Sequence, residues 1–164
     1  RYRDGDRQTW LDVQADEPLF AITGEHFDET FGSQPEALYD RLYFVETVDG
    51  EPVGTAAGWW NDAWEGSGAW GQIHWVAVRQ PFRGRGLAKP MVAVALQRIA
   101  QSHTRTMLDT NTARPWAIKV YLDSGFVPHP GDLVDPDVVA AWRRLQSKLE
   151  HPVLARTLTA YTAA

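Results

Sequence analysis

The chain has no cysteine, no long apolar run and no excess of basic charge. Without cysteine there can be no disulfide, no thiolate catalysis and no cysteine-ligated zinc site, and this fits the reducing cytoplasm, where we expect the protein to lie. No apolar segment approaches the ~20 residues that a membrane-spanning helix needs, so we expect no membrane association. The 16 basic residues are outnumbered by 21 acidic ones, and this net charge of −5 argues against a general nucleic-acid binder.

The length of 164 residues predicts a single domain over residues 1–164. His26, His103, His129 and His151 show no metal-ligand spacing, so we expect no metal and read them as surface or loop residues. The sequence leaves open whether the chain forms a homodimer.

The clearest pattern is an apolar run at residues 73–78, a turn that contains Arg83-Gly84-Arg85-Gly86, and a helical run after it. We read these as a strand, a turn and the N-terminus of a helix. A helix N-terminus offers unpaired backbone N–H groups and the positive end of the helix dipole, and both suit a phosphate. The two arginines add charge-assisted donors. The stretch therefore predicts a site for the pyrophosphate of a cofactor.

Helices are predicted where apolar residues recur at helical spacing behind a residue that can cap the helix. The predicted helices cover residues 6–17, 23–32, 33–39, 86–102, 116–122 and 135–149. Asp6, Thr23 and Asp135 are the expected capping residues, because their short polar side chains can accept hydrogen bonds from the first turn. The tail after Pro152 fits a helix and a strand equally well.

Strands are predicted at residues 42–48, 53–60, 72–78 and 106–110. The pair Asp49-Gly50 between the first two is a strong β-hairpin signal. Gly58 weakens its strand unless another backbone approaches closely there. A helix between the last two strands favours a crossover connection, so we expect those strands to be parallel. The fold class is therefore α/β, with a mixed sheet flanked by helices.

Two motifs together resemble the GNAT superfamily of N-acetyltransferases. Residues 78–86 read V-R-Q-P-F-R-G-R-G, which is similar to the family's cofactor motif with the proline one place late. The second motif, A-x-x-x-Y-x-x-x-G-F, is matched by Ala117, Tyr121 and Gly125-Phe126. Arg114 stands where the family often has an asparagine that contacts the pantetheine arm, and Asn111 is our candidate substitute. The resemblance covers about residues 42–127, together with a pair of helices expected N-terminal to them.

This resemblance implies a GNAT-like acyl-CoA N-acyltransferase fold whose central strands splay apart to admit acetyl-CoA. Backbone groups of Val76 and Val78 would pair with the pantetheine amides, and the N–H groups at residues 84–88 would hold the pyrophosphate. The predicted cofactor-binding residues are Val76, Val78, Arg83, Gly84, Arg85, Gly86, Leu87, Ala88, Asn111 and Ala117.

Acetyl transfer to an amine needs a base for the amine proton and an acid for the leaving thiolate. Tyr121 matches the family's acid, and a phenol with an ordinary pKa of ~10 stays protonated at neutral pH. The alternative is a core tyrosine whose hydroxyl is hydrogen-bonded. His74 is the candidate base, since its position resembles that of a strand histidine in the arylalkylamine (serotonin) N-acetyltransferase branch. Gln72, on the same strand face, could order a relay water.

His74 has rivals for the role of base. A hydrogen-bonded strand histidine needs no catalytic role, and many GNAT enzymes use a carboxylate or only water. Asp109, expected on the neighbouring strand, and Asp62 and Glu65, in the loop at residues 61–68, are the carboxylate candidates.

Five tryptophans fall within seventeen residues, at positions 59, 60, 64, 70 and 75. They could line an acceptor pocket, where indole rings attract an ammonium group, or they could pack the core. Trp59 and Trp60 are adjacent in a strand, so we expect them on opposite faces and favour packing for most of the five.

The sequence thus predicts an acetyl-CoA-dependent N-acetyltransferase that passes the acetyl group directly to a primary amine of a small molecule. Peptide or protein N-acetylation is an alternative acceptor assignment. A non-enzymatic acyl-CoA-binding module on the same fold is the alternative outside enzymes, and in it Tyr121 and His74 would be idle.

Overall fold

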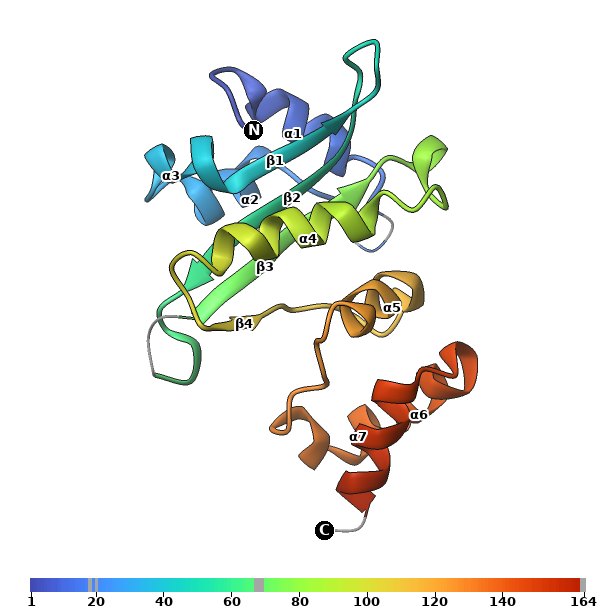
Figure 1. Ribbon diagram of the computed structural model, residues 1–164. Coiled ribbons are helices and arrows are strands. Elements are labelled where there is room, and N and C mark those ends of the chain that lie inside the picture. The colour runs from blue at the N-terminus through green and yellow to red at the C-terminus, as the bar shows by residue number, and fades with distance from the viewer. Residues whose placement is uncertain (18, 20, 67–69, 163–164) are drawn as a thin grey trace. The chain divides into compact units, whose positions relative to one another are not determined.

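The computed structural model describes residues 1–17, 19, 21–66 and 70–162 (Figure 1). Contacts divide the chain into two compact units, residues 1–108 and residues 109–164. That both units belong to a single domain stays a prediction. No helix in the described ranges is long and apolar enough to cross a membrane.

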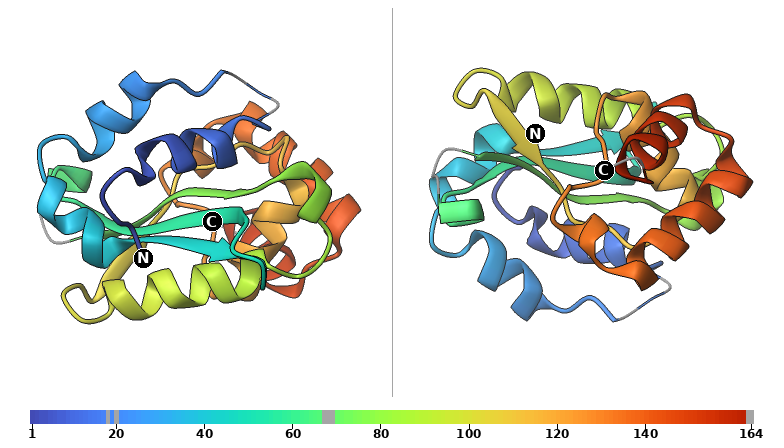
Figure 2. Two further views of the ribbon diagram at one scale, coloured as in Figure 1. Left: turned by 90° about the horizontal axis from the view of Figure 1, so that it is seen from above. Right: turned by 90° about the horizontal axis from the view of Figure 1, so that it is seen from below.

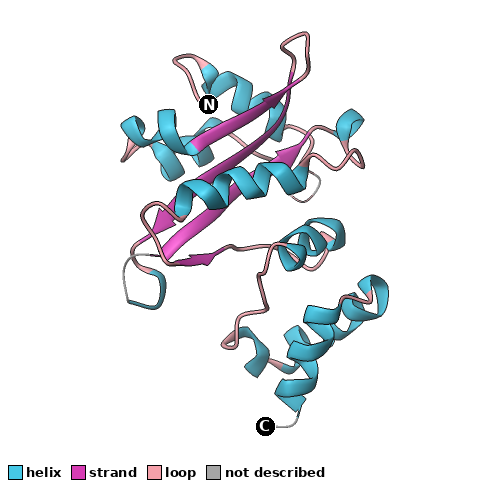
Figure 3. Ribbon diagram, viewed as in Figure 1, coloured by secondary structure: helices cyan, strands magenta, loops and turns pink. Residues whose placement is uncertain are grey.

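Unit 1 contains a mixed four-stranded sheet, with its strands in sequence order across the sheet (Figure 3). The strands are β1 (Leu42–Glu46), β2 (Pro52–Asn61), β3 (Trp70–Val78) and β4 (Arg105–Met107). β1 with β2 and β2 with β3 pair antiparallel, and β4 pairs parallel to β3. The prediction of a mixed sheet with a parallel crossover is confirmed, and β4 ends three residues earlier than expected.

The β1–β2 hairpin forms as Asp49-Gly50 predicted. Gly50 has a φ of +85°, a conformation that favours glycine. Its N–H donates to the Thr47 carbonyl at 3.0 Å, and the Thr47 N–H donates to the Glu51 carbonyl at 2.9 Å. This local turn chemistry fixes the pairing of β1 with β2.

The helices of unit 1 cover both faces of the sheet (Figure 2). They are α1 (Asp6–Gln14), α2 (Gly24–Phe31), α3 (Pro35–Arg41) and α4 (Ala88–Ile99), with single turns of 3₁₀-helix at η1 (Trp64–Gly66) and η2 (Gln80–Phe82). Thr23 caps α2 as predicted. Asp6 was expected to cap α1, but Gly5 holds that position, and the Asp6 carboxylate accepts a hydrogen bond from the Arg3 N–H at 2.8 Å.

The face of the sheet beneath α4 depends on close approach of the helix. A Cβ added to Gly58 would lie 2.7 Å from the Ala95 carbonyl oxygen, and one on Gly71 would lie 2.1 Å from Ile99 Cγ2. Only glycine admits α4 at this distance, so the prediction of close backbone approach at Gly58 is confirmed.

An aromatic core fills the opposite face, beneath α1 and α2. Its buried members are Trp10, Phe27, Phe31, Leu38, Leu42, Ala57 and Trp59. The rings of Trp59 and Trp60 stack with centroids 4.5 Å apart, which contradicts the expectation that they lie on opposite faces. Strand alternation fixes only the direction of the Cα–Cβ bond, and a long indole can turn back toward its neighbour. Packing explains Trp59, Trp60 and Trp75, which all belong to this core or pack against it.

Unit 2 is helical where it has regular structure, with α5 (Pro115–Asp123), η3 (Asp132–Val134), α6 (Pro136–Leu149) and α7 (Pro152–Thr162). Its core consists of Ile118, Leu122, Leu133, Leu145, Leu154 and Leu158. Asp135 caps α6 as predicted, with Oδ1 accepting from the Asp137 N–H at 2.8 Å. The tail left undecided by the sequence is a helix, because Leu154 and Leu158, four residues apart, both enter the core.

His151 lies in the loop between α6 and α7, as one of its two expected readings had it, but it is buried at 7% exposure, so the reading as a surface residue was wrong. Its Nε2 lies 3.1 Å from an Asp123 carboxylate oxygen, and its Nδ1 accepts from the Val153 N–H at 3.3 Å. The imidazole therefore joins α5 to the first turn of α7, a contact between distant residues that spacing could not reveal.

Candidate functional site

The predicted site residues lie in both units, so the two parts are described separately. β3 carries the first part. β4 pairs only with Trp70, Gly71 and Gln72 of β3, and among the described strands β3 has no other neighbour on that side. The backbone of β3 beyond Gln72, including Val76 and Val78, thus forms a free sheet edge, meaning one without a partner strand, although the Val78 carbonyl accepts from Arg83 at 2.9 Å. Such an edge can accept an extended ligand that carries amide groups, as an added strand would.

A β-bulge interrupts β3 within this free edge. Ala57 of β2 pairs with His74, whereas Thr55 pairs with Ala77, so Trp75 and Val76 together face the single residue Ala56. Trp75 has a φ of +50°, which is unusual for a large residue with a Cβ. The bulge turns the strand just before the predicted pantetheine contacts.

The turn after β3 is built from glycines and braced by its arginines. Gly84 and Gly86 have φ values of +76° and +79°, and nothing lies within 4 Å of a Cβ built on either. Arg83 donates to the carbonyls of Val78 and Asp16, each at 2.9 Å. Arg85 donates to the Pro81 carbonyl at 3.0 Å. Both guanidinium groups therefore hold the turn in shape, a role that the sequence did not suggest.

α4 begins at the end of this turn without a side-chain cap. Leu87 occupies the N-cap position and makes no capping hydrogen bond. The first turn of a helix has backbone N–H groups with no intrahelical acceptor, and the helix dipole is positive there. Lys89 is exposed in that first turn. An exposed glycine turn beside an uncapped helix N-terminus can bind a phosphate through backbone N–H groups.

His74 lies immediately before the bulge. Its ring meets the Trp75 ring edge-on, with centroids 5.3 Å apart. Burial lowers the pKa of His74 from its ordinary value of 6.5 to about 4. The imidazole is therefore uncharged at neutral pH and can accept a proton, although burial makes it a weak base.

Tyr121 lies on α5 in unit 2, with its ring edge-on to Phe126 at 6.2 Å between centroids. Burial raises the pKa of Tyr121 to about 12, and the nearby Arg114 guanidinium opposes part of that rise. The phenol therefore stays protonated at neutral pH. It can donate a hydrogen bond to a leaving thiolate.

The other predicted residues of unit 2 lie around the start of α5. Ala117 is on the helix itself. The Asn111 side-chain oxygen accepts from the Ala113 N–H at 2.8 Å, so this oxygen holds the connector before the helix. Asp109 lies beyond the end of β4, not on it, and burial together with Asp132 raises its pKa. Within the described ranges no three His, Asp or Glu side chains group as metal ligands.

Two residues that position the site were missed from the sequence. Asp16 accepts from the Gln80 N–H at 2.7 Å and ties the segment after α1 to the cofactor turn. Gln14, buried at 3% exposure, donates from Nε2 to the Trp75 carbonyl at 3.0 Å. Both contacts join segments more than sixty residues apart, so no local pattern predicts them.

Solved acetyltransferases share the fold of this chain. A putative acetyltransferase from Pyrococcus horikoshii matches with a TM-score of 0.62 and 18% identity. The match covers 79% of this chain but only 43% of the Pyrococcus chain. Glucosamine-6-phosphate N-acetyltransferase from Arabidopsis thaliana matches with a TM-score of 0.58 and 18% identity, over 79% of this chain and 90% of its own. Rv2747 from Mycobacterium tuberculosis, solved with CoA and NLQ, matches with a TM-score of 0.59 and 19% identity. The match covers 96% of this chain and 91% of the Rv2747 chain.

No curated protein sequence matches the chain significantly. The sequence model of the acetyltransferase (GNAT) family matches residues 7–126, which is most of the chain. This match spans the sheet, the glycine turn and the helix that carries Tyr121. The chain therefore belongs to the acetyltransferase (GNAT) family.

Proposed function

We propose that the protein is an acetyl-CoA-dependent N-acetyltransferase whose acceptor is the primary amine of a small molecule. The observation that carries this proposal is the free edge of β3 beyond Gln72, which leads directly into the glycine turn and the uncapped N-terminus of α4. A GNAT-family chain with this arrangement offers one surface for an extended amide arm and another for a pyrophosphate. Those are the two ends of the pantetheine diphosphate in CoA.

The residues present fit that co-substrate chemically. Val76 provides backbone N–H and carbonyl groups along the free edge for the pantetheine amides, and Val78 provides its N–H, since its carbonyl already accepts from Arg83. Gly84 and Gly86 leave the turn open to a pyrophosphate, because nothing lies within 4 Å of a Cβ built on either residue. Backbone N–H groups at residues 84–88 would then hold the anion, with the α4 dipole adding to the attraction.

The transfer itself forms one bond and breaks another. The amine nitrogen attacks the thioester carbonyl carbon, and the C–N bond forms. The nitrogen then becomes acidic enough to release a proton to water or to His74, which is uncharged and able to accept one. As the C–S bond breaks, the thiolate of CoA takes a proton from the Tyr121 hydroxyl, and the phenolate then regains a proton from water. This route is a direct transfer and needs no covalent enzyme intermediate.

A small-molecule acceptor is the finer part of the proposal. It is supported by the similarity to glucosamine-6-phosphate N-acetyltransferase, which by its name acetylates a small amine. At 18% identity that likeness supports the shared fold, and the acceptor is carried over only as a proposal. A peptide N-terminus and a protein lysine are the other acceptors to test.

The test is release of CoA thiol from acetyl-CoA with a panel of amines. The panel contains amino sugars, aryl- and alkylamines, a peptide with a free N-terminus, and an N-blocked peptide with one lysine. We expect release above background with at least one small amine. Release only with a peptide would overturn the small-molecule assignment. Tight binding of acetyl-CoA without release of CoA thiol in the presence of any acceptor would favour the non-enzymatic binding module.

A further inference from the structure

The bulge in β3 is held in an unfavourable backbone conformation. Trp75 adopts the left-handed region at φ +50°, where the Cβ of a large residue is crowded. A residue persists in such a conformation only when its surroundings hold it there. The surroundings of Trp75 come from α1 and α2, the two helices on this face of the sheet.

Gln14 of α1 holds the backbone of the bulge. Its Nε2 donates to the Trp75 carbonyl at 3.0 Å. The side chain is almost fully buried, and a buried amide is costly unless it is hydrogen-bonded. Losing this contact would leave both an amide N–H and the bulge carbonyl without a partner.

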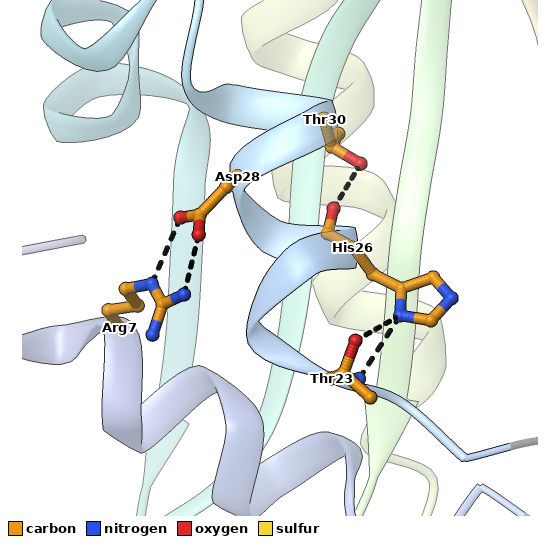
Figure 4. A network of polar contacts seen from close by, with 5 residues as sticks. All are labelled: Arg7, Thr23, His26, Asp28 and Thr30. Atoms are coloured by element: carbon orange, nitrogen blue, oxygen red, sulfur yellow. Dashed lines mark hydrogen bonds and ion pairs between the residues drawn. The ribbon is translucent and has the colours of Figure 1, made fainter.

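Thr30 of α2 holds the side chain of the same residue. Trp75 Nε1 donates to Thr30 Oγ1 at 3.0 Å, and the Thr30 hydroxyl donates to the His26 carbonyl at 2.8 Å. The Thr30 hydroxyl contacts the His26 carbonyl (Figure 4), so a lone pair of its oxygen is left for the indole. The indole also packs edge-on against Trp10, with centroids 5.2 Å apart.

The two helices are themselves tied together, so the two contacts act as one brace. Arg7 of α1 binds both carboxylate oxygens of Asp28 on α2, at 3.0 and 2.6 Å (Figure 4). A two-point guanidinium–carboxylate contact fixes orientation as well as distance. Neither helix can move without displacing Trp75 or breaking this pair.

We propose that Gln14 and Thr30 are positioning residues that hold the bulge of β3 in the shape that binds the pantetheine arm. This inference rests on the proposed acetyl-CoA site, because the braced residue directly precedes Val76. Neither side chain touches the cofactor. They act through the Trp75 backbone and indole, and α1 and α2 thereby become part of the cofactor site.

Four variants test the proposal. Gln14→Met removes the donor and keeps a long side chain, and Thr30→Val removes the hydroxyl and keeps the shape. Thr30→Ser restores the hydroxyl and is the rescue. Gln8→Met is the matched control, since Gln8 is an exposed glutamine of the same helix whose Nε2 donates to the Asp12 carboxylate at 2.8 Å. All four are assayed well below their melting temperatures, so that each is folded.

We expect Gln14→Met and Thr30→Val to raise the KM and the Kd for acetyl-CoA by about 3- to 10-fold, the usual effect of one lost hydrogen bond. The kcat at saturating cofactor should change less than the KM. Thr30→Ser and Gln8→Met should stay within twofold of the parent. In the cofactor-free protein, peptides that contain Val76 and Ala77 should exchange amide hydrogen faster in the first two variants.

A lower melting temperature with unchanged KM, Kd and amide exchange would overturn the proposal, because both residues would then serve only packing. A third outcome is that the parent protein fails to bind acetyl-CoA while Gln14→Met and Thr30→Val still exchange amide hydrogen faster than the parent. That result would separate the brace of the bulge from the proposed acetyl-CoA site. The brace of the bulge would stand, whereas the proposed function and the cofactor role of the brace would both fail.

Discussion

At the scale of single residues, burial sets the charge of the two candidate catalytic groups. Burial raises the pKa of Tyr121 to about 12, so the phenol is protonated at neutral pH and can donate a proton. It lowers the pKa of His74 to about 4, so the imidazole is uncharged at neutral pH and has a nitrogen that can accept a proton. The two shifts keep the phenol protonated and the imidazole uncharged at neutral pH, and they also make each group weaker than one whose pKa lies near 7.

Replacing Tyr121 by phenylalanine tests the acid. We expect Tyr121→Phe to lower kcat by about 10²–10⁴-fold, because the thiolate would leave without a proton donor. The Kd for acetyl-CoA should change little, since only one hydroxyl is removed. The control is Tyr161→Phe, a tyrosine exposed on α7. A Tyr121→Phe enzyme with the parent's kcat would remove this residue from the mechanism.

Burial of His74 also predicts how stability depends on pH. The pKa of His74 is about 4 in the folded chain and near 6.5 when unfolded, so the unfolded chain binds more protons between these values. This contribution to stability is complete above pH 6.5 and is lost as the pH falls toward 4, by up to roughly 3 kcal/mol. Chemical denaturation of the parent and of His74→Gln at both pH values measures it.

The pH dependence should be smaller in His74→Gln than in the parent. His26→Gln is the matched control, because glutamine at the third helical position preserves a capping box and His26 packs against the same indole, Trp75. Equal pH dependence in the parent and His74→Gln would show that His74 is not buried in its neutral form.

At the scale of elements, the glycine turn before α4 should bind the pyrophosphate. Gly84→Val combines backbone strain at φ +76° with a side chain placed in the proposed anion site. Gly50→Val in the β1–β2 hairpin imposes the same kind of strain at φ +85° with no predicted cofactor contact. We expect each change to cost about 1–2 kcal/mol of stability. Only Gly84→Val should weaken acetyl-CoA binding, by more than tenfold, as measured by calorimetric titration.

A Gly84→Val variant that binds acetyl-CoA as tightly as the parent would exclude the turn from the site. Equal loss of binding in both variants would instead mean that strain alone disturbs the protein. Comparing Gly84→Val with Gly50→Val therefore separates the effect of backbone strain from the effect of filling the space proposed for the pyrophosphate.

The elements that the sequence predicted well are those with local causes. Asp49-Gly50 dictates a hairpin, and Thr23 and Asp135 cap helices within their own first turns. The bulge at Trp75 could not be predicted, because tryptophan does not favour a positive φ and its conformation depends on Gln14, sixty-one residues away in the chain. The stacking of Trp59 on Trp60 and the burial of His151 depend on tertiary packing in the same way.

At the scale of the whole molecule, the predicted cofactor residues divide between unit 1, with the β3 edge and the turn, and unit 2, with Asn111 and Ala117. If one acetyl-CoA molecule contacts both units, binding must stabilise both together. At a hundredfold excess over its Kd, the ligand should add about 2.7 kcal/mol and raise the melting temperature by roughly 5–10 °C.

Differential scanning calorimetry with acetyl-CoA, with ATP as the control, measures this coupling. We expect one cooperative transition that acetyl-CoA shifts upward and that ATP at the same concentration does not shift. A shared transition is also what a single domain over residues 1–164 requires, because independent domains unfold separately. Two transitions of which acetyl-CoA moves only one would confine the cofactor to one unit and divide the chain into two domains. A larger shift with ATP would point to a different nucleotide at the turn.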